Sequence, residues 1–168
     1  MRTISRGGGK VILSALQVKE TTFEIAYNKY SKMLYRLAFS IVLSGVDAED
    51  AVQNVFYKYL CKEPEFGTEE YERAWFVRVT INQCKDSIRR RKVRTTLPLD
   101  EIINLGVYDK QSEVLSTLFS LPEKYKTVLI LYYMEGFKVE EIAQMAELSK
   151  SAVKMRLSRG RELLKDKL

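Results

Sequence analysis

Residues 139–165 read VEEIAQMAELSKSAVKMRLSRGRELLK, and this stretch decides the fold. Apolar residues recur at helical spacing on both sides of the joint at Glu147 and Leu148, which predicts two helices, 139–146 and 149 to about 165. Two helices joined by a turn of three or four residues, the second one basic, form the helix-turn-helix pattern. An ordinary helical hairpin has the same spacing, so the spacing alone leaves both readings open.

The second of these helices has two distinct faces. Val153, Leu157 and Leu164 share a stripe that can pack against a core. Ser149 is the expected N-cap, so free backbone N–H groups at the helix start can approach phosphates. The surface beside the apolar stripe carries the candidate DNA contacts Lys154, Met155, Ser158 and Arg159. The alternative is a solvated basic face that meets no DNA.

The segment before the motif also reads as helical. A helix is expected over 112–118, and residues 120–123 (SLPE) have a Ser at a cap position, a Pro in the first turn and a Glu three residues on. This capping box predicts a long helix over 121–134, ended by Glu135 and Gly136. Residues 93–111 lack a sustained period and contain Pro98, so we expect a flexible linker there, with a short helix around 99–105.

Three further helices are predicted in the first half of the chain. An amphipathic pattern runs over 23–42, a second helix begins with Asp47 as its N-cap and stops near Pro64, and a third spans about 71–91. In the third helix Val77, Ile81, Cys84 and Ile88 form an apolar stripe, and Trp75 is expected to anchor the core. A second stripe at the same spacing carries Arg78, Asn82, Lys85 and Arg89.

Composition restricts the class of function. The chain is 46% apolar and 30% charged with a formal charge of +6, and its basic residues cluster in 85–94 and 149–168, which favours two contacts with a polyanion. It has no histidine, and Cys61 and Cys84 lack the CxxC spacing, so we expect neither a catalytic centre nor a metal site. No apolar run reaches the length of a membrane span or a secretory signal, which predicts a cytoplasmic protein.

Three segments together resemble the extracytoplasmic-function RNA polymerase sigma factors. Residues 140–161, preceded by 121–128, are similar to the promoter-reading helix-turn-helix of that family. Residues 47–56 (DAEDAVQNVF) resemble its core-polymerase-binding helix, and residues 73–91 resemble its melting and minus-10 helix. The resemblance covers 23–168 with the segments in family order.

The resemblance implies an all-α protein of two small helical domains, which binds core polymerase and directs it to promoters. Residues 1–20 would be an N-terminal tail, 21–92 a region-2-like domain, 93–111 the linker, and 112–168 a region-4-like domain. The implied partners are core RNA polymerase, through its β′ coiled coil and β flap, promoter DNA and an anti-sigma factor. No cofactor, small-molecule substrate or enzymatic activity is implied.

The resemblance also implies three sets of site residues. The set facing the β′ coiled coil is Asp50, Gln53 and Asn54. The minus-35 set is Lys150, Ser151, Lys154, Met155, Ser158 and Arg159. The minus-10 set is Phe66, Tyr71, Arg78, Asn82, Lys85 and Arg89. Phe66 and Tyr71 would stack on a flipped base, although both residues are equally compatible with a core role.

The chain departs from the family pattern at three positions. Lys138 stands where a capping Ser is common, Glu147 where a turn glycine is usual, and Asn54 where the core-binding helix often has an acid. A left-handed turn at Glu147 would cost on the order of 1 kcal/mol relative to glycine.

Two other classes of function remain compatible with the residues. A dimeric repressor or activator would use 121–168 for DNA and the first domain for dimerisation, and would bind palindromic sites. A helical adaptor that binds only protein would lack salt-dependent DNA affinity. A hydrolase or nuclease is the least compatible, because no carboxylate cluster or metal-ligand spacing occurs.

Overall fold

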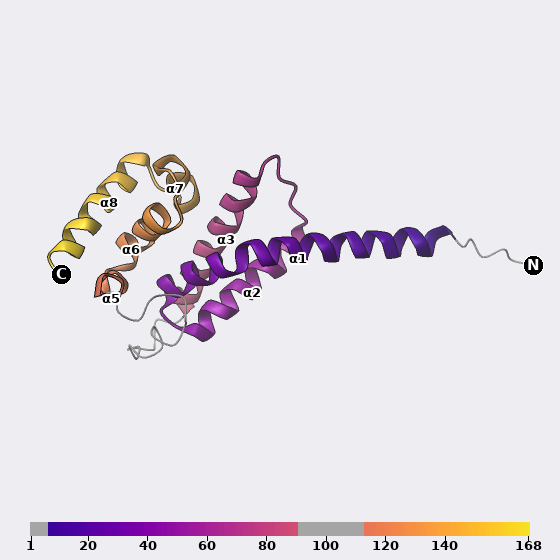
Figure 1. The fold of residues 1–168 in the computed structure, drawn as a ribbon, viewed down its shortest axis with the longest axis horizontal. Coiled ribbons are helices and arrows are strands. Elements are labelled where there is room, and N and C mark those ends of the chain that lie inside the picture. The colour runs from indigo at the N-terminus through magenta and orange to yellow at the C-terminus, as the bar shows by residue number, and fades with distance from the viewer. Residues whose placement is uncertain (1–6, 91–112) are drawn as a thin grey trace, which may run out of the picture.

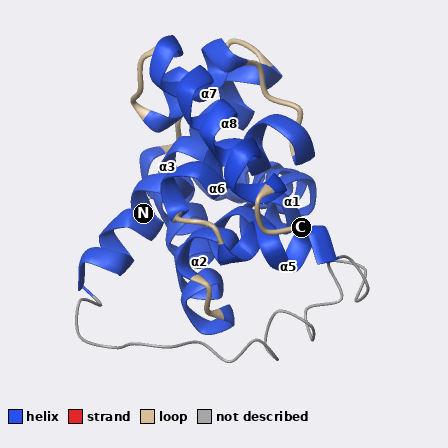
Figure 2. Ribbon diagram, turned by 90° about the vertical axis from the view of Figure 1, so that its left-hand side faces the viewer, coloured by secondary structure: helices blue, strands red, loops and turns tan. Residues whose placement is uncertain are grey.

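The computed structural model describes residues 7–90 and 113–168, and within these residues every regular element is a helix (Figures 1 and 2). The first group contains α1 (Gly7–Val42), α2 (Gly45–Lys62) and α3 (Glu69–Arg90). The second group contains α5 (Glu113–Ser120), α6 (Glu123–Leu129), the π-helical turn η1 (Ile130–Met134), α7 (Val139–Ala146) and α8 (Lys150–Lys165). The all-α prediction is confirmed, whereas the predicted linker, 93–111, and the short helix predicted within it lie wholly outside the described residues.

Helix α1 is longer than the pattern over 23–42 predicted. It begins at Gly7, so residues 7–20, which the sequence assigned to a tail, are helical. No proline occurs before Pro64, so nothing in this segment interrupts the backbone hydrogen bonds of a helix. Figure 1 shows the N-terminal half of α1 projecting well beyond the rest of the molecule.

Aromatic rings fill the core of the first domain. Phe76 is fully buried, and the ring centroids of Tyr30, Tyr59 and Phe56 lie 4.8, 5.1 and 5.3 Å from its own. Trp75 stands edge-on to Phe76 at 5.2 Å, as expected for a core anchor. The apolar stripe of α3 is confirmed at Val77, Ile81 and Cys84, but Ile88, in the last turn of the helix, is 39% exposed.

Two helix starts differ from their predictions. Helix α2 is capped by Ser44, whose hydroxyl accepts a hydrogen bond from the N–H of Asp47, so Asp47 lies in the first turn and is not the cap. The capping box predicted at Ser120 is also wrong, because Pro122 is the N-cap of α6 and the Ser120 hydroxyl donates to the carbonyl of Thr117. The fixed φ of proline sets this helix start without a side-chain cap.

The second domain has an aliphatic core with one close backbone approach. Its buried residues include Leu129, Ile142, Val153 and Leu157. A Cβ at Gly160 of α8 would lie 2.9 Å from the Leu129 side chain, so this glycine lets α6 and α8 approach closely.

The two groups of helices pack against each other into one continuous core. Helix α1 contacts α6 and helix α3 contacts α7, as Figure 1 also shows. Phe39 of α1 and Phe119 of α5 are buried and stand edge-on, 6.1 Å apart. The sequence predicts two domains joined by a flexible linker, and no local pattern in it indicates this contact.

Candidate nucleic-acid interface

Helix α8 presents the exposed face that its pattern predicted. Val153 and Leu157 are buried beneath it. The residues predicted to contact the minus-35 element, namely Lys150, Ser151, Lys154, Met155, Ser158 and Arg159, are all exposed. Met155 is 63% exposed, which is unusual for a large apolar side chain without a partner surface.

The start of α8 is capped as predicted. The Ser149 hydroxyl accepts a hydrogen bond from the N–H of Ala152 at 3.1 Å and lies 2.9 Å from the Ser151 hydroxyl. The cap leaves the positive end of the helix dipole exposed beside the cationic side chains of Lys150 and Lys154. This end of α8 is therefore chemically suited to phosphate oxygens.

The turn of the helix-turn-helix has the left-handed geometry that was expected at Glu147, where the family usually has glycine. Glu147 has φ 57° and ψ 47°, and the N–H of Leu148 donates to the carbonyl of Ala143 at 2.8 Å. At the start of α7, the Glu141 carboxylate accepts a hydrogen bond from the N–H of Lys138 at 2.6 Å. Glu141 therefore supplies the half of a capping box that satisfies the backbone N–H of the N-cap residue, while Lys138 supplies no side-chain cap.

Carboxylates within the motif hold two of its cations in place. Lys150 pairs with Glu140 at 3.3 Å, and Arg159 pairs with Glu162 at 2.8 Å. A hydrogen bond to its own backbone N–H and the contact with Lys150 lower the pKa of Glu140. All four side chains are more than half exposed, so exchanging these carboxylates for phosphates costs little.

The basic stripe of α3 is present but is partly committed to another contact. Lys85 and Arg89 are exposed, with Arg89 beside Asp86 at 3.6 Å, and Asn82 is half-buried. Arg78 is 57% exposed and pairs with Glu147 at 3.3 Å. Arg78, which was predicted to contact the minus-10 strand, therefore touches the turn of the helix-turn-helix that was predicted to read the minus-35 element.

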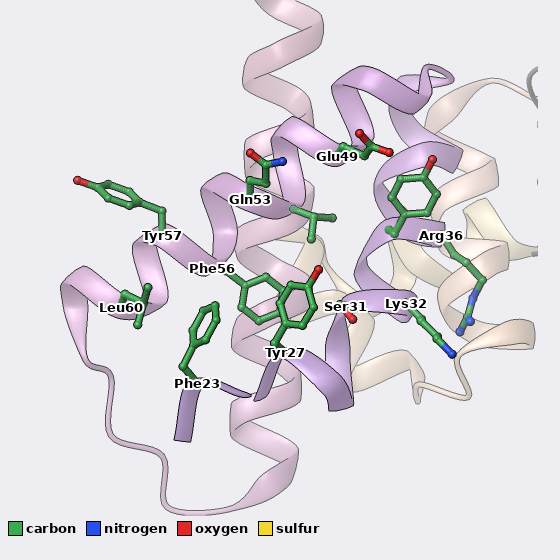
Figure 3. Close-up of a pocket in the computed structure, with 12 residues that line it drawn as sticks. Phe23, Tyr27, Ser31, Lys32, Arg36, Glu49, Gln53, Phe56, Tyr57 and Leu60 are labelled. Carbon is green, nitrogen blue, oxygen red and sulfur yellow. The ribbon is translucent and has the colours of Figure 1, made fainter. Parts of the chain in front are cut away.

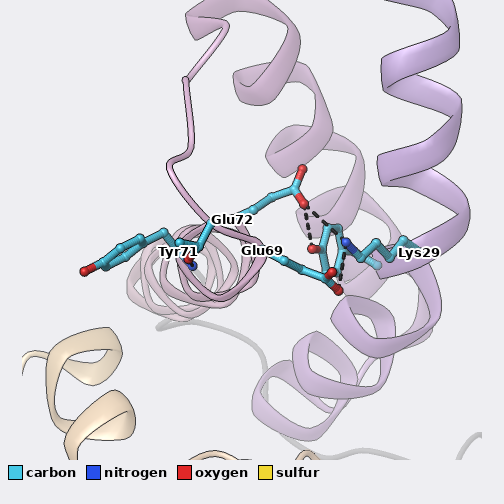
Figure 4. Close-up of polar contacts among 6 residues, drawn as sticks. Lys29, Glu69, Tyr71 and Glu72 are labelled. Carbon is cyan, nitrogen blue, oxygen red and sulfur yellow. Dashed lines mark hydrogen bonds and ion pairs between the residues drawn. The ribbon is translucent and has the colours of Figure 1, made fainter.

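The two aromatic residues before and at the start of α3 have different environments. Phe66 packs edge-on against Trp75 at 5.8 Å, whereas Tyr71 is 67% exposed and points away from the domain in Figure 4. On the other side of α3, Lys29 pairs with Glu69 at 2.9 Å and the Tyr30 hydroxyl donates to Glu72 at 2.8 Å (Figure 4). Burial and the contact with Glu72 raise the pKa of Tyr30 to about 12, so it stays a donor. Of Phe66 and Tyr71, Tyr71 is the one that offers an open ring face.

An apolar groove of about 810 Å³ runs between α1 and α2 (Figure 3). Of the three residues predicted to bind polymerase, Gln53 lines it, whereas Asp50 and Asn54 do not. The Asn54 amide donates to the Asp50 carbonyl at 2.8 Å and to its carboxylate at 3.2 Å. The lining residues are Phe23, Tyr27, Ser31, Lys32, Tyr35, Arg36, Glu49, Val52, Gln53, Phe56, Tyr57 and Leu60.

Sequence reasoning missed most of this groove, although a signal was present. Gln53, Tyr57 and Leu60 recur at i, i+4 and i+7, which places them on one face of a helix, beside the buried stripe. Tyr57 and Leu60 are 67% and 46% exposed. A second apolar stripe on a helix that already has a buried one indicates a docking surface.

The described residues contain no group of three or more His, Cys, Asp or Glu side chains that could hold a metal ion. Burial, with a smaller contribution from Glu123, raises the pKa of Cys84 to about 12, whereas Cys61 is exposed. Among the described helices none is both long and apolar enough to span a bilayer.

Comparison with known proteins identifies both halves of the chain. Residues 26–94 match the family model of sigma-70 region 2, and residues 111–164 match that of sigma-70 region 4. The RNA polymerase sigma factor SigV of Bacillus subtilis is 33% identical over 80% of this chain and 83% of its own length. The ECF RNA polymerase sigma factor SigW of the same organism is 24% identical over 83% of this chain and 84% of its own.

A solved structure shares the fold. It is that of the sigma factor RpoE in complex with the anti-sigma factor NepR from Bartonella quintana, and RpoE aligns with a TM-score of 0.65 and 21% identity over 88% of this chain and 94% of its own. The two region models match in the order of the chain, and the relatives cover most of its length. The chain therefore belongs to the extracytoplasmic-function RNA polymerase sigma factors, which bind core polymerase and start transcription at specific promoters.

Proposed function

We propose that the exposed face of α8 reads the minus-35 element in the major groove. Support comes from a capped helix start, buried Val153 and Leu157 on one side, and exposed Lys154 and Arg159 on the other. Met155 provides apolar surface for thymine methyl groups, and the cations provide phosphate and base-edge contacts. Lys150, Ser151 and Ser158 complete this face. The observation that carries the proposal is that none of these contact residues is needed for packing, because the buried side chains of Val153 and Leu157 lie on the opposite side of the helix.

We assign the minus-10 element to α3 and the loop before it. Arg78, Lys85 and Arg89 would follow the phosphates of the non-template strand, and the half-buried Asn82 would contact a base edge. Tyr71, with its exposed ring, would stack on a flipped base. Phe66, packed on Trp75, would support this loop from beneath rather than stack on the base.

The groove between α1 and α2 is our proposed seat for the β′ coiled coil. It offers apolar surface from Tyr27, Tyr57 and Leu60, with Gln53 and Glu49 for polar recognition. Asp50 and Asn54 would form the rim of this contact. The region-4-like domain, residues 112–168, would meet the β flap, and residues 21–92 would form the region-2-like domain.

Three further assignments follow from this role. The chain would act without an enzymatic activity or cofactor of its own, because the chemistry of initiation belongs to the polymerase. It would work in the cytoplasm, where core polymerase and promoter DNA are found. We also propose an anti-sigma factor as a partner, since the fold is shared with a sigma factor solved in complex with one.

Reconstituted transcription tests this proposal. Promoters selected from genomic DNA by the chain with core polymerase are transcribed in vitro with wild-type protein, and specific run-off products are expected. Polymerase binding without specific initiation would contradict the proposal. A homodimer that binds palindromic sites without polymerase would favour the repressor alternative.

A further inference from the structure

The contact between the two domains is organised around Glu135, just after η1. Its side chain is only 6% exposed, and its carboxylate pairs with Arg36 of α1 at 3.0 Å. Its backbone carbonyl accepts a hydrogen bond from Arg73 of α3, whose guanidinium also lies 4.1 Å from the ring centre of Phe137. Two cations from the first domain thus hold one short segment of the second.

The exposed pair between Arg78 and Glu147 adds a further polar contact between the domains. It joins the proposed minus-10 face to the turn of the proposed minus-35 motif. Lys150 is three residues after Glu147, and three residues span at most about 11 Å. At this point the proposed minus-10 face on α3 therefore lies close to the proposed minus-35 face on α8.

This packed form cannot serve both promoter elements at once. The minus-10 and minus-35 elements are separated by about 25 base pairs, or about 85 Å of duplex at about 3.4 Å a step. The chain between Arg90 and Glu113, fully extended at about 3.5 Å a residue, reaches on the order of 75 Å. The linker alone is shorter than this span, but α3 with its 22 residues adds about 33 Å at about 1.5 Å a residue. The chain is therefore long enough to reach both elements once the domains separate, and promoter binding requires that separation.

Arg36 takes part in two sites. It lines the groove between α1 and α2, and its guanidinium reaches Glu135 of the second domain; Figure 3 shows it at the end of the groove. A partner that fills the groove with acidic side chains near this end would compete with Glu135 for Arg36. Buried Glu135 would then lose its ion-pair partner, which destabilises the packed form.

We propose that the packed form is the resting state of this sigma factor, and that core polymerase opens it by taking Arg36 from Glu135. The inference rests on the proposed function, because it requires the groove to be the polymerase site. Opening frees Arg78 for the minus-10 strand and separates Glu147 from α3. Polymerase docking and promoter reading are thereby coupled through one side chain.

The test measures the distance between the domains in the full chain by energy transfer. One dye is placed on the exposed Cys61 and the other on a cysteine introduced by Lys167→Cys, while buried Cys84 stays unlabelled. We expect the transfer measured in the free wild-type chain to fall after addition of core polymerase, because opening moves the two dyes apart. Glu135→Gln and Glu147→Gln should lower the transfer before polymerase is added.

The affinity of the variants for core polymerase distinguishes the effect of domain opening from the contact that Arg36 makes in the groove. Glu135→Gln releases Arg36 and raises the fraction of molecules in the open form that binds polymerase. The affinity for core polymerase should therefore rise about threefold or more. Arg36→Ala also opens the chain but removes a groove contact, so the affinity should fall. Glu140→Gln is the matched control, because it removes the same charge from the second domain without touching the first.

Several results would overturn the inference. These are unchanged transfer on polymerase binding, unchanged transfer in Glu135→Gln and Glu147→Gln before polymerase is added, or equal affinities for Glu135→Gln and Glu140→Gln. Glu147 is 59% exposed, so Glu147→Gln keeps the test valid if Glu135→Gln unfolds. Failure of the wild-type chain to bind polymerase at all would refute the proposed function, and the inference with it.

Discussion

The two domains use their surfaces in different ways. In the first domain the functional groove is continuous with the aromatic core, since Phe56 is a buried core residue and also lines the groove. In the second domain the cationic face of α8 lies opposite the residues that pack, with Val153 and Leu157 beneath and Lys154 and Arg159 outside. Substitution of Phe56 should therefore change stability and binding together, whereas substitutions on the cationic face of α8 should change binding alone.

The largest expected effect is at the centre of the aromatic core. Phe76→Ala removes a fully buried ring that contacts Tyr30, Phe56 and Tyr59, and should lower the free energy of unfolding by about 3–5 kcal/mol. Chemical denaturation measures it. The control is Tyr57→Ala, exposed on the groove, which should change stability by less than about 0.5 kcal/mol. If Phe76→Ala and Tyr57→Ala lowered the free energy of unfolding by similar amounts, the groove would have to be counted as part of the core.

The next effect concerns a charge in the second domain. Lys126 is buried, and burial lowers its pKa to about 8, below the value of about 10.4 expected in the unfolded chain. The unfolded state thus binds the proton more tightly between these values, so stability should rise by about 3 kcal/mol from pH 8 to above pH 10 through this group. Lys126→Met should lack this rise.

The difference between the denaturation curves of wild type and Lys126→Met isolates this residue, because other groups titrate equally in both. The Lys126 ammonium donates to the Phe119 carbonyl at 3.2 Å, beside the contact of Phe119 with Phe39. A pH-independent difference between the two proteins would mean that Lys126 reaches water in the folded state.

Removal of a cation from α8 should affect binding alone. Arg159→Ala should weaken binding to a minus-35 duplex by about 1–3 kcal/mol, as a lost base contact does, and leave stability almost unchanged. Fluorescence anisotropy with the polymerase-bound protein measures the affinity. Lys165→Ala, exposed at the other end of α8, is the control and should have little effect on specificity. Unchanged promoter output in Arg159→Ala would show that α8 is oriented differently.

The smallest expected effect is in the turn. Glu147→Gly relieves a φ of 57° and should stabilise the fold by up to about 1 kcal/mol, offset in part by loss of the exposed pair with Arg78. Thermal denaturation beside Glu147→Gln separates the two contributions, because Gln keeps the strain but loses the charge. A glycine variant less stable than the glutamine variant would contradict the strain argument.

Local patterns predicted local structure well. The buried stripes of α3 and α8, the cap at Ser149 and the left-handed turn at Glu147 all depend on residues within a few positions of one another. The cap at Ser44 was missed because Asp47 offered an equally good side chain three residues on. The break of the helix over 121–134 into α6 and η1 has no local signal in the sequence.

Long-range contacts could not be read from the pattern. Arg36 and Glu135 are 99 residues apart, and each looks like an ordinary surface charge within its own helix. Burial of Lys126 similarly depends on how α5 and α6 pack, since Phe119 supplies the acceptor. The groove follows from the way α1 crosses α2, although the second stripe on α2 indicated half of it.

The most direct test of the central claim compares the two proposed surfaces in one assay system. Affinity for core polymerase and affinity of the resulting holoenzyme for minus-35 DNA are measured for Gln53→Ala with Tyr57→Ala and for Lys154→Ala with Arg159→Ala. We predict that the first pair weakens only polymerase binding and the second pair only DNA binding. Loss of polymerase affinity in the α8 pair, with no loss in the groove pair, would contradict the assignment of both surfaces.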